Sequence, residues 1–387
     1  MIRSYLEKRN REILRDLKSL IEQIIGAQAP DELLIYKNKV LERCKSLSKD
    51  IELNLKYLAI DEDSILEDLL SKTQQATQET RLMSSMWIVP VLRARTSDRL
   101  CLSTIQWLHQ SHSETTTYPP AFINGNCAIR PFLHIAPIYL FPSVEQISLL
   151  YQPLLFHEFG HLLYSIHKPE MDDLVRELQY EVDELLMPVS QRNDRYSENM
   201  NAQRQDIAYT WYSWAQELFC DAVGFEIGGP SFLHAFSNFL NTRDMGNYYR
   251  DPRGLQYSSH PVTWLRIHFL SRRASEAGFY DLATEIENEW DEVAQLMGII
   301  EDYHGYYDES VDHVVLKTIQ DMLIEASPRH FEETEVVEDG SLDESSSLVR
   351  LFNSAWEIYL NDFEKYSSWE QNQIETYLKR IPARSKQ

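Results

Sequence analysis

The run HEFGH at residues 157–161 constrains this chain more than any other segment. Apolar residues bound it on both sides, at 154–156 and at 162, 163 and 166, which favours a buried helix. On a helix, residues four apart lie one turn above each other, so His157 and His161 are expected to face one metal ion about 2 Å away. Glu158 would project beside that ion, where a carboxylate can take a proton from bound water. The run therefore predicts a helix that carries two metal ligands and a general base.

A second segment, Trp214–Ala222, offers acidic groups at the same spacing. If it is helical, Glu217 and Asp221 lie on one face. Glu217 is the predicted third ligand, and Asp221 is predicted to accept a hydrogen bond from the far nitrogen of a ligating histidine and so fix its tautomer. The alternative is that both acids are solvated. The apolar residues around them favour burial instead, and buried acids need partners.

A third segment, Ser258–Ile267, places His260 next to Pro261 and brings Arg266 into a predicted helix beginning. A donating or cationic group here would stabilise the oxyanion that forms when hydroxide attacks a carbonyl, so His260 is a candidate catalytic residue. Taken alone, this segment indicates little.

Taken in order, HEFGH at 157–161, ELFCD at 217–221 and SHPVTWLRI at 259–267 resemble the gluzincin branch of zinc peptidases. Within that branch they are most similar to the HtpX-type and CAAX-prenyl-protease-type metallopeptidases, over about 110 residues. The resemblance implies a zincin-like catalytic core with one zinc ion. The roles that it implies are those of zinc ligands for His157, His161 and Glu217, catalytic base for Glu158, supporting acid for Asp221, and shaping of the active site for His260 and Arg266.

Three departures from the pattern of these relatives matter. Cys220 stands where the pattern has Ala, Ser259 replaces Thr, and the membrane spans typical of the family are absent. The absence of spans makes an integral-membrane substrate or a prenylated tail doubtful. Soluble bacterial intracellular peptidases with these motifs are the nearer analogy.

The wider pattern predicts an α+β fold that is mostly helical. Apolar residues recur at helical spacing through residues 1–86, with a third helix expected over Asp63–Met83. Short β-prone runs between Trp87 and Phe141, among them Leu100–Trp107, predict a small antiparallel sheet. The run Phe132–Leu140 contains Pro137 and so fits an edge strand better than a central one. The predicted divisions are a helical region at 1–86, the metallopeptidase domain at 87–331, an acidic linker or loop at 332–347 and a helical segment at 348–387.

Charge and composition limit the classes of partner that this protein is expected to bind and where it is expected to act. The chain carries 37 Lys and Arg against 60 Asp and Glu, a net charge of -23, which disfavours nucleic acid and anionic lipid. No apolar run approaches the roughly 20 residues of a membrane span, and no signal-peptide pattern opens the chain. Four cysteines without a CxxC pair fit a reducing compartment, so a cytoplasmic location is expected. The first 50 residues hold 11 basic and 8 acidic residues, and these helices either bind a protein partner or pack on the main domain.

These observations together predict a zinc-dependent peptidase that acts on a peptide or protein substrate. An aminopeptidase needs an acidic anchor for the substrate amine, and the chain has no GxMEN-like run, which favours an endopeptidase. This endopeptidase is expected to be intracellular and to have a restricted substrate. The alternative is a zinc-containing interaction or regulatory protein without turnover. Glu158 counts against that alternative, because a structural zinc site needs no general base and normally closes its fourth position.

Overall fold

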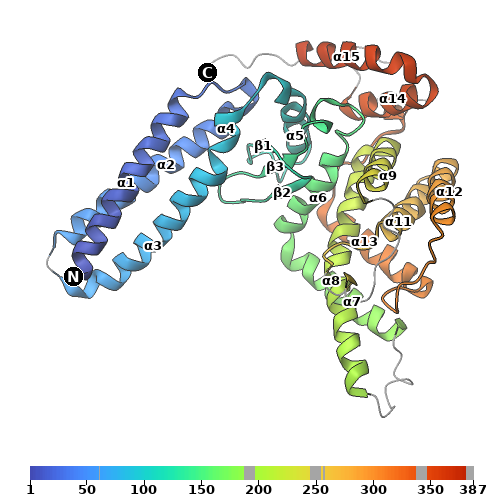
Figure 1. Ribbon diagram of the computed structural model, residues 1–387, viewed down its shortest axis with the longest axis horizontal. Helices are drawn as coiled ribbons and strands as arrows, with labels where there is room; N and C mark the ends of the chain where they lie inside the picture. Colours follow the sequence, from blue (N-terminus) through green and yellow to red (C-terminus); the bar gives the residue numbers. More distant parts are fainter. Residues whose placement is uncertain (61, 187–196, 245–253, 256–257, 337–346, 381–387) are drawn as a thin grey trace. The chain divides into compact units, whose positions relative to one another are not determined.

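The computed structural model describes residues 1–387 apart from 61, 187–196, 245–253, 256–257, 337–346 and 381–387 (Figure 1). The fold is mostly helical with a small sheet, which confirms the predicted α+β class. Two compact units divide the chain, one of residues 1–147 with 376–387 and one of residues 148–375. The predicted boundary at 86/87 falls inside the first unit, and most of the predicted acidic linker at 332–347 lies outside the described residues.

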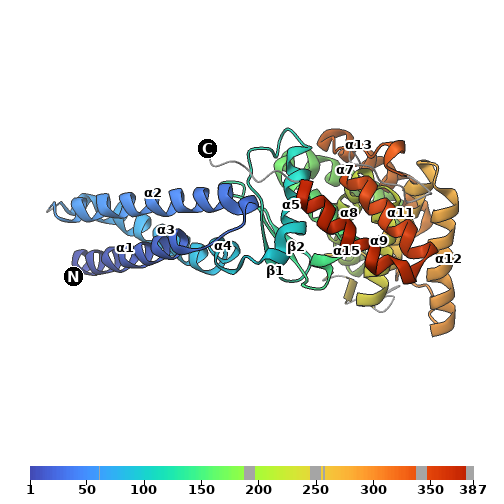
Figure 2. The same ribbon diagram turned by 90° about the horizontal axis from the view of Figure 1, so that it is seen from above.

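Three long helices open the first unit: α1 (Ile2–Gly26), α2 (Leu34–Leu58) and α3 (Leu66–Leu82). They lie side by side in both views of the ribbon (Figures 1 and 2). The buried positions of α1 recur every three or four residues, which gives the helix one apolar face against its neighbours. The helical prediction for this region is therefore confirmed.

The segment that follows is more helical than predicted. After α4 (Val89–Arg93) comes α5 (Arg99–Gln110), which covers the run Leu100–Trp107 that was predicted as β-prone. That prediction was wrong because residues 100–105 are all buried. A short buried run that includes β-branched residues cannot be assigned to a helix or a strand from its sequence alone.

The sheet has three strands, β1 (Ala121–Asn124), β2 (Ala128–Arg130) and β3 (Ile138–Phe141), in the order β1-β3-β2. β1 pairs parallel with β3, and β2 pairs antiparallel with β3. The sheet is thus mixed rather than antiparallel, and β3 is central rather than an edge strand. Pro137 is tolerated because it lies just before β3, where only its carbonyl is used: it accepts from the Ala121 N–H at 3.0 Å.

The second unit consists of packed helices (Figure 1). Pro153 directly precedes the motif helix α6, a position where the missing N–H of proline costs nothing. Among the described residues, no helix combines the length and apolar character that a bilayer crossing requires. The helices are α6 (Leu154–Ile166), α7 (Lys168–Leu186), α8 (Ser197–Gly228), α9 (Pro230–Asp244), α11 (Thr263–Glu276), α12 (Tyr280–Met297), α13 (Asp312–Ala326), α14 (Leu348–Asn361) and α15 (Phe363–Arg380), the last of which runs into residues 376–387 of the first unit.

Candidate metal centre

Two helices of the second unit meet at the HEFGH run. α6 carries His157, Glu158 and His161, and α8 carries Glu217. The helices approach closely at Gly160: a Cβ added to this glycine would lie 2.8 Å from the Cα of Cys220. The missing side chain at Gly160 therefore lets α8 come near enough for Glu217 to face both histidines.

Replacing Gly160 with Ala is expected to separate α6 from α8. The new methyl group would overlap the α8 backbone, which cannot move aside as a side chain does, so we expect a loss of about 1–3 kcal/mol in stability together with weaker metal binding. Thermal unfolding and zinc titration measure the two effects. Gly26→Ala is the matched control, because a Cβ at Gly26 meets nothing within 4 Å. Unchanged stability and zinc affinity in Gly160→Ala would contradict the close contact.

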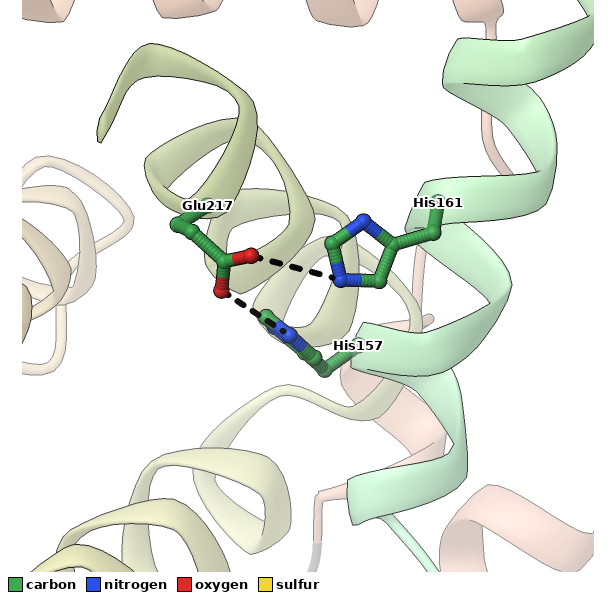
Figure 3. A group of neighbouring side chains, drawn as sticks. All are labelled: His157, His161 and Glu217. Carbon is green, nitrogen blue, oxygen red and sulfur yellow. Dashed lines mark ion pairs between the residues drawn. The ribbon is translucent and has the colours of Figure 1, made fainter. Parts of the chain in front are cut away.

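Three side chains converge on one point between the helices (Figure 3). The Nε2 atom of His157 lies 3.5 Å from Oε2 of Glu217, and Nε2 of His161 lies 3.6 Å from Oε1 of the same carboxylate. Ligand atoms about 2 Å from a tetrahedral zinc ion stand about 3.3 Å apart, close to these spacings. The cluster brings together all three residues that the sequence predicted as ligands.

The far nitrogen of each histidine meets a side chain from α8. Nδ1 of His157 lies 2.8 Å from Oδ1 of Asp221, and Nδ1 of His161 lies 3.3 Å from the sulfur of Cys220. A partner at Nδ1 holds the imidazole ring and leaves Nε2 free to bind a metal ion. Asp221 stands where the sequence predicted it. From the sequence, Cys220 could be a thiol beside the metal or a small buried residue; it is buried, and its sulfur contacts His161.

Arg266 on α11 completes the surroundings of Asp221. Its Nε and Nη2 atoms donate to the two oxygens of Asp221, at 2.8 and 2.6 Å, and Nη2 lies 3.3 Å from Oε2 of Glu217. The guanidinium also lies over the ring of Phe236, 4.7 Å from its centroid, and the ring of His157 stacks on Phe236 at 5.8 Å. Phe236 on α9 thus contacts both His157 and the group that neutralises Asp221. No sequence signal distinguishes it from other core aromatics.

Glu158 and His260 differ in their exposure. Glu158 is only 4% exposed, and no described residue forms a side-chain hydrogen bond with it. Burial raises the pKa of Glu158 to about 7. The side chain of His260 is 53% exposed, with Nε2 3.4 Å from Oε2 of Glu217 and Nδ1 2.8 Å from Oγ of Ser259. Glu158 is therefore a carboxylate poised to exchange a proton near neutral pH, and His260 lies on the solvent side of Glu217.

The histidines and Glu217 predict how metal affinity changes with pH. Burial opposes charge on His157, but the neighbouring carboxylates of Asp221 and Glu217 outweigh it and raise the pKa of His157 to about 9. Burial lowers the pKa of His161 to about 4. Burial opposes the charge on Glu217 as well, yet His157 and Arg266 hold the pKa of Glu217 well below its usual range. At neutral pH, His157 is the ligand that must release a proton before it can bind a metal ion.

Zinc affinity is consequently expected to rise about tenfold for each pH unit between about pH 6 and 9, and to level off above that range. Competition with a chromophoric chelator at several pH values measures this slope. Calorimetry at pH 7 in buffers of different ionisation enthalpy should count about one proton released for each zinc ion bound. An affinity that does not change across this range would contradict a protonated His157.

Comparison with known proteins adds no relative: the chain matches no protein-family model, no curated protein and no solved structure.

Proposed function

We propose that this protein binds one zinc ion through His157, His161 and Glu217 and hydrolyses peptide bonds. The observation that carries the proposal is the convergence of these three side chains, together with the buried Glu158, whose charge interacts with those of His157 and Glu217. The sequence resemblance to gluzincin peptidases supports the same assignment from the order of three motifs.

The donor set fits zinc. Two imidazole nitrogens and one carboxylate are the ligands of many catalytic zinc sites, which keep a fourth position open. Oε2 of Glu217 is buried and makes no hydrogen bond of normal geometry, although His157, His260 and Arg266 lie within 3.5 Å. A buried carboxylate oxygen without a hydrogen bond is costly unless something binds it. A metal ion held by the cluster would satisfy this oxygen.

The chain's own residues divide the remaining work of hydrolysis. A zinc ion bound here would polarise the scissile carbonyl and make water more acidic. Glu158 accepts the proton of the attacking water and passes it to the leaving amine. His260 approaches the cluster from the solvent side, where its Nε2 donates to the oxyanion that develops on the carbonyl. Asp221 and Arg266 hold His157 in place.

The setting of the reaction is also part of the proposal. We place it inside the cell, because no disulfide bond joins Cys44, Cys101, Cys127 or Cys220. There it would act as an endopeptidase with a restricted substrate. The N-terminal helices α1–α3 are proposed to bind a protein partner. Several of their large apolar side chains are exposed, including Tyr5, Leu53 and Tyr57, which supports this role.

Removal of the metal tests the proposed function. Protein stripped with a chelator and then given one equivalent of zinc is incubated with a mixture of peptides and proteins, next to the stripped protein alone. Mass spectrometry is expected to find cuts at internal peptide bonds only in the sample with zinc. One equivalent of tightly bound zinc without any cut would favour the alternative, an interaction or regulatory protein without turnover.

A further inference from the structure

A pocket in the first unit lies apart from the residues of the metal centre. Its volume is about 350 Å³, within the range of sites that hold small molecules. α4 forms one part of the wall and β1 another. The three consecutive residues of β1 that line it, Phe122, Ile123 and Asn124, point alternately to opposite faces of the sheet, so the pocket lies at the edge of the strand.

Two arginines of this pocket have uncompensated charge. Arg93 at the end of α4 and Arg95 two residues later are both exposed, and no acid among the described residues forms an ion pair with either guanidinium. By contrast, the neighbouring Arg99 pairs with Glu32 at 2.9 Å. The one acid among the lining residues is Asp98, whose carboxylate already accepts the backbone N–H of Arg95 at 2.7 Å. The carboxylate of Asp98 therefore binds the backbone of its own loop.

The remaining wall combines small polar groups with an apolar floor. Ser85, Ser143 and the amide of Asn124 offer hydrogen-bond donors, and Pro90 and Phe122 offer buried apolar surface. Guanidinium groups bind carboxylate and phosphate through paired hydrogen bonds. The ligand that fits both features is an oxyanion attached to an apolar body.

The charge distribution of the chain also favours an anion here. Residues 1–147 contain 18 basic and 18 acidic residues, whereas the other 19 basic and 42 acidic residues give the whole net charge of -23. The acidic excess thus lies entirely outside the segment that forms the pocket. At physiological salt, exposed charges are screened beyond about 8 Å, so Arg93 and Arg95 dominate the potential that a ligand meets.

We propose that this pocket binds a small organic oxyanion, an aromatic or aliphatic phosphate or carboxylate, with Arg93 and Arg95 holding the anion. The proposal is independent of peptide hydrolysis, because no residue of the metal centre lines the pocket.

Phenyl phosphate and benzoate are suitable probes, with benzyl alcohol as the uncharged comparison. Binding to the full-length protein is measured by ligand-observed NMR titration. Fragments of this size bind with a Kd of about 1 mM when the site fits them. The variant Arg93→Gln/Arg95→Gln is expected to weaken binding at least tenfold. Arg130→Gln is the matched control, because Arg130 is an exposed arginine on β2 that does not line the pocket, and its effect should stay within about twofold.

Tighter binding of phenyl phosphate would identify an organic phosphate as the ligand class, and tighter binding of benzoate a carboxylate. The proposal is overturned if neither probe binds below about 10 mM, if benzyl alcohol binds as well as the anions, or if the double variant binds like the wild type. Zinc content and peptide cleavage are expected to be unchanged in the double variant. Loss of the proposed peptidase function would therefore leave this test unaffected.

Discussion

Glu158→Gln is expected to lower peptide turnover by about 10³-fold while one zinc ion remains bound. Gln has the size of Glu but cannot take a proton from water. Glu158 is not one of the three converging ligands, and no described residue forms a side-chain hydrogen bond with it, so the substitution breaks no such contact. The loss should fall on kcat rather than on KM, because the proton moves only in the transition state. The measurements are kcat and KM on a peptide that the wild type cuts, with zinc content beside them.

Stability provides an independent readout of the same variant. Burial raises the pKa of Glu158 from 4.5 to about 7, so folding disfavours its ionised form. Wild-type protein should lose stability from this group as the pH rises from about 4.5 through 7, because the unfolded carboxyl ionises first. Without zinc, Glu158→Gln should therefore melt higher than the wild type at pH 8 and equally at pH 4.

The control for this variant is Glu177→Gln, an exposed position on α7 that should change neither activity nor stability. A Glu158→Gln protein that keeps most of its turnover would refute the general-base role. One that loses zinc together with activity would instead give Glu158 a structural role.

The sequence predicts the pairs of site residues on α6 and on α8 better than it predicts that these two helices pack against each other. A four-residue spacing on a helix is a local property, and it placed His157 with His161 and Glu217 with Asp221. That α6 and α8 approach each other at Gly160 and Cys220 depends on which helix faces pack, and a single sequence does not show this. The order of the three motifs supplied the link only through resemblance.

Cys220 and Phe236 contribute to the candidate centre through contacts that the sequence does not show. Both act through contacts with the histidines rather than through a motif of their own: Cys220 meets Nδ1 of His161, and Phe236 stacks on His157. A cysteine or a phenylalanine in an apolar helix is indistinguishable from an ordinary core residue before the packing is known. Such positions emerge only from the tertiary arrangement.

The fold was predictable where the pattern was long and periodic. The helices of residues 1–86 bury one face each, so their apolar period was visible. The short strands carried too little pattern to give their partners. β1 and β3 pair in parallel although residues 125–137 separate them in the sequence. Nothing in the sequence of either strand indicates a parallel pairing. The prediction of an edge strand from Pro137 was wrong, because a proline disfavours a central strand only when it lies inside that strand. Pro137 lies just before β3.

Arg266→Met is expected to destabilise the second unit by about 3–5 kcal/mol in the absence of zinc. Arg266 is buried and donates twice to Asp221, so its removal leaves a buried carboxylate that, among the described residues, keeps its ion pair with His157. Methionine fills a similar volume, which limits the effect of lost packing. Hydrogen exchange of the α8 amides reports the stability of this unit separately from the first unit.

A second substitution tests whether the unpaired charge of Asp221 causes the loss of stability in Arg266→Met. Asp221→Asn in the Arg266→Met background removes the negative charge, and we expect it to restore much of the lost stability. Metal binding should not recover in the same way. Asp221→Asn replaces the carboxylate that accepts from Nδ1 of His157 with a neutral amide, and loss of such a partner costs about 10- to 100-fold in metal affinity.

Arg273→Met is the matched control on the same helix. Arg273 is also buried, but its guanidinium donates to the neutral side chain of Gln320 at 3.1 Å, so its removal strands no carboxylate. Its effect on stability should be smaller, and zinc affinity should not change. If Arg273→Met costs as much as Arg266→Met, or if Asp221→Asn restores nothing, then Arg266 stabilises α8 through packing alone. If stability returns with Asp221→Asn while zinc affinity stays low, then Arg266 makes the buried Asp221 tolerable and Asp221 keeps His157 ready for the metal ion.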